Sequence, residues 1–286
     1  GGEASRFMEA EFIFVRRSLE SQIRELPPLP TAVTKVLQAS QDPMVPIEEI
    51  GKVISSDQAL TTKILRTVNS SYYGLARQIA NVTQAVVILG MEQVRNVTMA
   101  SAAGGAFKGK GAKHEAVLNQ FWSHSFAASA TAGGIAVSRR WAPKRVCELQ
   151  TAGLVADMGR LFLYASFPDA FCTLIDRAKA AGVDFETAER EIMGMPHAAI
   201  GSEIADRWGF PASIVTTIAA HEHQFPLDAE DDAAVIRLAD ASQKGHYLLL
   251  SELTPSPPPL HRCGLDDDVW QAICGRAQAG LAATGS

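Results

Sequence analysis

Apolar residues recur along this chain at steps of three and four, which is the period of an amphipathic helix. Ile47, Ile50, Val53 and Ile54 form one such stripe, and similar stripes follow it, each closed by Pro, Gly or Asn. β-Branched residues seldom alternate with polar residues, so strands are not indicated. The pattern predicts an all-α protein.

The first third of the chain is predicted to form a smaller helical lobe. Residues 1–21 have helical spacing and are predicted to be a connector helix or linker that precedes this lobe, because prolines follow soon after. The lobe itself takes up residues 22–112. The stretch rich in glycine and lysine from Gly104 to Lys113 interrupts the helical period, and we place the boundary between lobes there.

Residues 113–286 are predicted to form a larger lobe with longer helices. A run of prolines makes residues 254–260 an extended loop, since consecutive prolines favour polyproline II over helix. A last helix is expected to begin at the acidic run Asp266 to Asp268, where negative charge complements a helix N-terminus.

Composition narrows the class of protein. The 286 residues are 47% hydrophobic and 20% charged, which is typical of a globular chain. The 26 Lys and Arg are dispersed and the net charge is −5, so we expect no direct nucleic-acid binding. The four cysteines form no CxxC pair and no apolar run approaches 18 residues. We therefore expect a cytoplasmic protein without membrane association.

The larger lobe also contains titratable side chains within apolar helical runs. These are His124, Asp157, His197, His221 and Asp240. Helical bundles build metal sites from such groups on facing helices, so a shared site for a divalent ion is geometrically possible. His221 and His223 differ by about 200° around a helix, so both cannot face one ion unless the helix has ended. We expect His221 to face the site and His223 to lie at its rim.

The residues taken alone leave a structural alternative open. A single helical histidine such as His124 is commonly a hydrogen-bonded residue of a partial core. Asp157 can pair with Arg160, three residues later, and Asp240 can pair with Arg237 by the same spacing.

Several stretches resemble the HDOD domain, a bacterial signalling module related to the HD phosphohydrolases. They are "ISSDQALTTKILRTVNSSYYG", "AGLVADMGRLFL" and "MPHAAIGSEIADRWGFPASIVTTIAAHEH", and the resemblance extends over roughly residues 22–245. It implies a two-lobed helical fold in which a smaller N-terminal lobe packs on a lobe shaped like the HD hydrolases. Members of this family are generally described as non-hydrolytic partners in signalling.

The resemblance also bears on chemistry. In active HD phosphohydrolases a His-Asp pair helps to hold divalent metal that activates water against a phosphoester. Here the aspartate of the pair is Asp157, followed by the matching Gly159 and Arg160, but the position of the histidine is Ala156. A methyl group offers no lone pair. We therefore expect no catalytic residue and no resident cofactor, or at most a divalent metal at low occupancy, with Arg160 the residue placed to contact a ligand.

Without a metal, Asp157, His197 and His221 could form a buried hydrogen-bonded network that holds helices in register. In the smaller lobe, Asp57, Asn69, Ser70 and Tyr73 match polar or aromatic positions of the family motif. Turn chemistry accounts for these residues, so we expect them to be structural.

The function that these expectations favour is a non-catalytic output module. It would transmit a signal by binding a signalling protein partner, downstream of a receiver or sensory domain. The alternative is a metal-dependent phosphohydrolase acting on nucleotides or cyclic dinucleotides, with the five titratable residues as ligands and Arg160 near the substrate phosphate. Regulation by a small ligand between the lobes is a third possibility.

Overall fold

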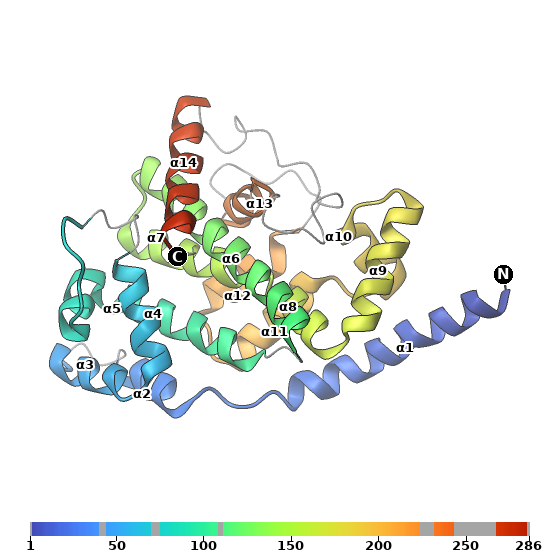
Figure 1. Ribbon diagram of the computed structural model, residues 1–286, viewed down its shortest axis with the longest axis horizontal. Coiled ribbons are helices and arrows are strands. Elements are labelled where there is room, and N and C mark those ends of the chain that lie inside the picture. The colour runs from blue at the N-terminus through green and yellow to red at the C-terminus, as the bar shows by residue number, and fades with distance from the viewer. Residues whose placement is uncertain are drawn as a thin grey trace.

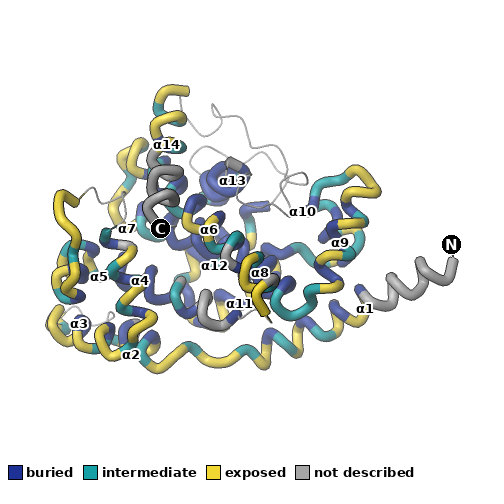
Figure 2. The backbone as a smooth tube through the Cα atoms, viewed as in Figure 1, coloured by how far each residue is buried: buried dark blue, intermediate teal, exposed yellow. Residues whose placement is uncertain are grey.

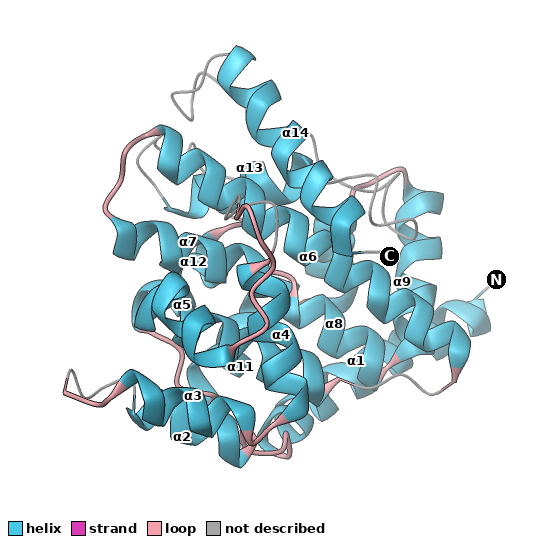
Figure 3. Ribbon diagram, turned by 60° about the vertical axis from the view of Figure 1, so that its left-hand side comes forward, coloured by secondary structure: helices cyan, strands magenta, loops and turns pink. Residues whose placement is uncertain are grey.

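A computed structural model describes residues 2–39, 44–69, 75–107, 111–222, 232–242 and 267–284. All regular structure in these ranges is helical, which confirms the all-α prediction (Figures 1 and 3). The elements in chain order are α1 Gly2–Arg24, α2 Thr31–Ala39, α3 Ile47–Ser55, α4 Gln58–Val68, α5 Val82–Ala106, α6 Ala112–Ser138, α7 Pro143–Val155, α8 Met158–Ser166, α9 Pro168–Ala181, α10 Phe185–Ala188, the π-helix η2 Glu189–Met193, α11 His197–Arg207, α12 Ala212–Ala220, α13 Asp232–Ser242 and α14 Asp267–Thr284.

The smaller of two apolar cores lies among α2, α3, α4 and the first part of α5. Its fully buried residues include Ile50, Ile54 and Ile64, which come from the stripes that predicted these helices. Helix α3 approaches α5 closely at Gly51, where a Cβ would lie 2.5 Å from Thr83 Oγ1. Burial of these stripes stabilises helices of only 9 to 11 residues, because helices this short are only marginally stable in isolation.

Two of the polar residues predicted to be structural hold the ends of these helices. The carboxylate of Asp57 accepts a hydrogen bond from Leu60 N at 2.8 Å at the start of α4. The amide of Asn69 joins the end of α4 to Ile79, accepting from Ile79 N at 2.7 Å and donating to Ile79 O at 2.7 Å. Ser70 and Tyr73 lie outside the described residues.

The larger core gathers α6 to α13, and Figure 2 shows buried residues concentrated where α6, α12 and α13 meet. Helix α1 runs along this core (Figure 1) and buries Phe12, Val15, Leu19 and Ile23, a stripe at steps of three and four. The segment predicted as a connector is thus a helix that continues to Arg24 and has one face packed on the larger core.

Helix α5 links the two cores. It is kinked at Gly90, whose φ of 75° lies in the region that favours glycine, and it then continues to Ala106. Val97 belongs to the smaller core and Met99 to the larger one. The helical period is therefore kept at Gly104, where the sequence indicated a break, and α6 begins at Ala112. The lobe boundary at residue 112 stays a prediction.

The last helix, α14, begins at Asp267, within the acidic run expected to start it. The proline-rich residues 254–260 lie outside the described ranges. None of the described helices combines the length and the apolar character that crossing a bilayer requires.

Candidate functional site

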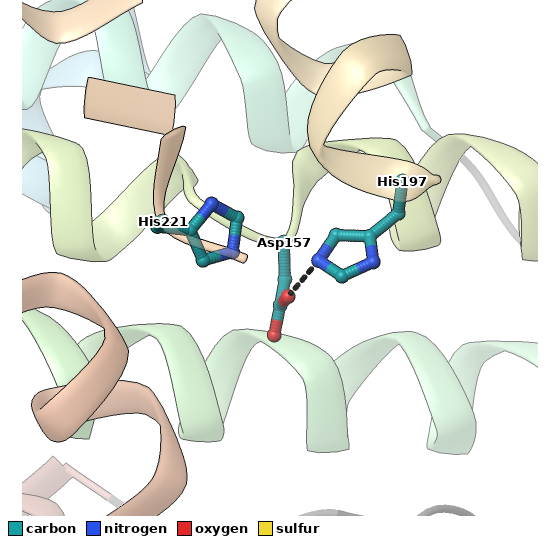
Figure 4. Close-up of side chains that lie close together, drawn as sticks. All are labelled: Asp157, His197 and His221. Atoms are coloured by element: carbon teal, nitrogen blue, oxygen red, sulfur yellow. Dashed lines mark ion pairs between the residues drawn. The ribbon is translucent and has the colours of Figure 1, made fainter. Parts of the chain in front are cut away.

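The structure brings all five predicted titratable residues into one buried cluster in the larger lobe. They come from five places in the chain: His124 from α6, Asp157 from the corner between α7 and α8, His197 from the first residue of α11, His221 from the residue after α12, and Asp240 from α13. All five side chains are buried. Figure 4 shows Asp157 lying between His197 and His221.

Asp157 is at the centre of this cluster. Its Oδ1 lies 2.9 Å from Arg160 Nη1 and 3.2 Å from His197 Nε2, and its Oδ2 lies 3.3 Å from His124 Nε2. Burial alone would raise the pKa of Asp157, but the charge of Arg160 and the close contacts with the two histidines hold this pKa well below its usual range. The pair with Arg160, which the sequence left open as an alternative, is present and lies in the interior rather than on an exposed helix.

His124 is bound to two carboxylates. Its Nε2 is 2.6 Å from Asp240 Oδ1, in addition to the contact with Asp157. Burial lowers the pKa of His124, but the charges and hydrogen bonds of these carboxylates outweigh it and raise the pKa to about 9. His124 is therefore an imidazolium at neutral pH. Arg237, the other partner considered for Asp240, has Nη2 3.9 Å from Glu186.

His197 contacts two glutamates that the sequence reasoning missed. Nδ1 is 2.6 Å from Glu189 Oε2, and Nε2 is 2.8 Å from Glu222 Oε1, although Nε2 is not aligned for a hydrogen bond. Burial and the charge of Arg160 lower the pKa of His197, but the charges of Glu189 and Glu222 prevail and raise it to about 10. His197 is thus a second buried imidazolium.

The two glutamates differ in how visible they are in the sequence. Glu222 directly follows His221, so adjacency was a usable signal. Glu189 opens the π-helix η2, whose wider turn shifts side chains out of the α-helical period, and the periodic pattern contains no sign of it. Both are buried, and burial raises the pKa of Glu222 well above its usual value.

The pKa of His221 is shifted in the opposite direction from those of His124 and His197. Its Nδ1 donates to Ile218 O at 2.6 Å, so Nε2 is the nitrogen without a proton, and it has no hydrogen-bond partner among the described residues. Burial and the neighbouring charge of His197 lower the pKa of His221 to about 4. Helix α12 ends at Ala220, before His221, so helix geometry does not set His221 and His223 on opposite faces; His223 lies outside the described residues.

Arg160, expected to contact a ligand, is itself buried within the cluster. Its Nη1 binds Asp157, its Nη2 is 3.0 Å from Glu222 Oε1, and its Nε is 3.6 Å from Glu189 Oε1. The charges of these carboxylates outweigh burial and raise the pKa of Arg160 well above its usual value. The guanidinium therefore faces three carboxylates of its own chain.

Two glycines allow the helices that carry these groups to meet. A Cβ on Gly159 would collide with the carbonyl oxygen of His197 and would lie 2.8 Å from Gly201 N. A Cβ on Gly201 would in turn lie 3.2 Å from Gly159 N. The glycine of the "DMGR" stretch thus lets α11 approach α8, and this approach places His197 beside Asp157.

The described residues contain three overlapping groups of metal-binding type. They are Asp157, His197 and His221; His124, Asp157 and Asp240; and Glu189, His197 and Glu222. The free lone pair of His221 Nε2 suits a divalent ion. An ion bound by the remaining donors would have to take the place of protons on His124 and His197, whose pKa values are raised, and would share Asp157 with Arg160.

A further acid, Glu186, is buried beside this cluster. Burial raises the pKa of Glu186, as it raises that of Glu222.

Comparison with known proteins places this arrangement in a family. An uncharacterized protein of Treponema pallidum (strain Nichols) is 24% identical over 214 residues, which are 75% of this chain and 40% of that protein. The chain therefore spans less than half the length of this curated relative.

Two solved structures share the fold. The "Putative phosphohydrolase" of Shewanella amazonensis SB2B matches with a TM-score of 0.67 and 22% identity, over 92% of this chain and 96% of that chain. The "Putative signal transduction protein" of Marinobacter aquaeolei VT8 matches with a TM-score of 0.69 and 21% identity, over 93% and 60% of the two chains. The model of the HDOD domain matches residues 26–224, which contain His124, Asp157, His197 and His221. This protein therefore belongs to the HDOD domain family.

Proposed function

We propose that this chain is a non-catalytic signal-transduction module that acts by binding a protein partner. The observation that carries the proposal is the missing ligand at Ala156, directly beside Asp157. Ala156 is buried and offers no ligand atom, and Asp157 is already paired with Arg160 at 2.9 Å. Metal-assisted hydrolysis needs a complete set of ligands and an open position for water.

The likeness to the signal transduction protein of Marinobacter aquaeolei is in keeping with this role. In the proposal a receiver or sensory domain precedes α1, and the module works in the cytoplasm. Helix α1 suits such a link, because it packs on the larger core along one face and continues to Arg24 as one helix.

A second candidate function rests on one observation. His221 Nε2 is a buried lone pair without a partner among the described residues, and it lies in one group with Asp157 and His197. That feature favours a metal-dependent phosphohydrolase acting on nucleotides or cyclic dinucleotides, in keeping with the likeness to the phosphohydrolase of Shewanella amazonensis. It would require His197 to lose its proton to the metal.

Hydrolysis assays separate the two. The purified chain is incubated with Mn²⁺, Ni²⁺ or Zn²⁺ and with bis-p-nitrophenyl phosphate or a cyclic dinucleotide, beside the matched Asp157→Asn variant. We expect the same background turnover from both proteins. Metal-dependent turnover in the unmodified chain that disappears in Asp157→Asn would establish the hydrolase and overturn the signalling proposal.

A further inference from the structure

We propose that Arg160 is the resident cation of this cluster, taking the electrostatic place that a divalent metal has in a catalytic one. The inference rests on the proposed function and gives it a cause: the guanidinium occupies carboxylates that a metal ion would need, in addition to the ligand that is missing at Ala156.

The guanidinium of Arg160 lies among acids from three parts of the chain. Its three nitrogens face three carboxylates, with Nη1 2.9 Å from Asp157, Nη2 3.0 Å from Glu222 and Nε 3.6 Å from Glu189. These carboxylates come from the corner between α7 and α8, from η2, and from the second residue after α12. A planar fork with several donors can bridge acids that approach from different elements, as a metal ion does.

Arg160 and these three acids are all buried. A carboxylate that is ionised out of water, as that of Asp157 is, requires a compensating charge. Arg160 supplies it permanently, because the guanidinium does not lose its proton in proteins. Unlike a metal, it cannot accept a lone pair from His221 or bind and activate a water molecule.

Arg160 also contacts residues of all three candidate metal groups. Arg160 contacts at least one carboxylate in each of the three groups: Asp157 is shared by two of them, and Glu189 and Glu222 belong to the third. An ion entering any of these groups would therefore share at least one carboxylate with the guanidinium. Removing Arg160 should free carboxylates beside the lone pair of His221.

The test uses Arg160→Ala with Mn²⁺ as the only added probe. After dialysis, metal binding is measured by the electron paramagnetic resonance signal of free and bound Mn²⁺, and the Tm is measured with and without Mn²⁺. We expect the unmodified chain to bind no Mn²⁺ and to keep its Tm. We expect Arg160→Ala to have a lower Tm without metal, to bind Mn²⁺ and to recover about 5 °C at a hundredfold excess over Kd.

Arg145→Ala is the matched control. Arg145 pairs with Asp232 at 2.7 Å, a partly buried pair outside the three groups, so Mn²⁺ should not restore the Tm of this variant. Should Arg160→Ala fail to fold without metal, it is refolded with Mn²⁺. Recovery of the helical circular dichroism signal then supports the proposal, and failure to recover overturns it.

Two other results would also overturn the proposal. One is Mn²⁺ binding by the unmodified chain, because the guanidinium and the metal would then coexist. The other is a folded Arg160→Ala that binds no Mn²⁺. Neither result decides the signalling role, which depends on the hydrolysis assay, so the two proposals can fail separately.

Discussion

Gly159 lies directly against the backbone of His197, at the point where α8 meets α11. No side chain fits there, because a Cβ on Gly159 would collide with the carbonyl oxygen of His197, and backbone cannot move aside as a flexible side chain can. The glycine of the family motif therefore serves a packing purpose, which is to bring the imidazole of His197 to Asp157.

Gly159→Ala should force α8 and α11 apart. We expect a loss of about 2–3 kcal/mol in the free energy of unfolding, since overpacking against backbone has few ways to relax. Urea denaturation followed by circular dichroism measures it. Gly275→Ala in α14 is the control, because nothing lies within 4 Å of the added Cβ, and the better helix propensity of alanine should add up to about 1 kcal/mol. Equal effects in both variants would contradict the packing role.

The two imidazolium groups predict a loss of stability at alkaline pH. His124 and His197 have pKa values raised in the folded state to about 9 and about 10 from an ordinary value of 6.5. Their contribution is therefore fully present below pH 6.5 and is lost as the pH rises through 9 and 10. Each can remove on the order of 1 kcal/mol per pH unit in that window.

Urea denaturation at half-unit steps from pH 6.5 to pH 10 checks this slope. His124→Asn keeps a polar group beside Asp240 but does not titrate, so its slope should be about half as steep. A slope that His124→Asn leaves unchanged would show that His124 is not charged in the folded protein.

In the smaller lobe, Asn69→Ala should lower the free energy of unfolding by about 1–3 kcal/mol. The substitution leaves the N–H and the carbonyl of Ile79 without the partners that fix them to the end of α4. Thr62→Ala is the matched control on the same helix, because its exposed hydroxyl bonds only the local Gln58 O, and it should change stability by less than about 0.5 kcal/mol. Thermal unfolding of both variants decides whether Asn69 is structural.

Arg16 and Glu189 should be energetically coupled, although they do not touch. Arg16 Nε donates to Met193 O at 3.0 Å, at the end of the π-helix that Glu189 opens. In a double-mutant cycle, Arg16→Ala and Glu189→Gln should deviate from additivity by at least about 0.5 kcal/mol in the free energy of unfolding. Arg24→Ala, which removes an exposed pair with Glu20 on the same helix, should combine additively with Glu189→Gln and serves as the control.

Much of this architecture could be predicted from the sequence, for a physical reason. The stripes around Ile50 and Ile64 follow the helical period, and burial of these stripes makes the helices. His124 and Asp240 were found because a titratable group inside an apolar run is conspicuous. Glu189 could not be found in this way, since the π-turn breaks the period on which the reasoning depended.

The role of Arg160 shows a different limit. The sequence predicted its pair with Asp157, but the spacing of three residues is the same for a weak exposed pair and for a buried one. Only the packing of η2 and of the turn after α12 brings Glu189 and Glu222 to the same guanidinium. These contacts depend on tertiary packing, so the local pattern of apolar and polar residues does not show them.

The five-residue π-helix η2 is contacted at both of its ends. Arg16 Nε of α1 donates a hydrogen bond to Met193 O, and Glu189 Oε2 lies 2.6 Å from Nδ1 of His197. One short turn of chain thus separates α1, which runs along the outside of the larger lobe, from the buried charged cluster around Asp157. Arg16 thus ties α1 to the same short turn of chain that sets Glu189 against His197.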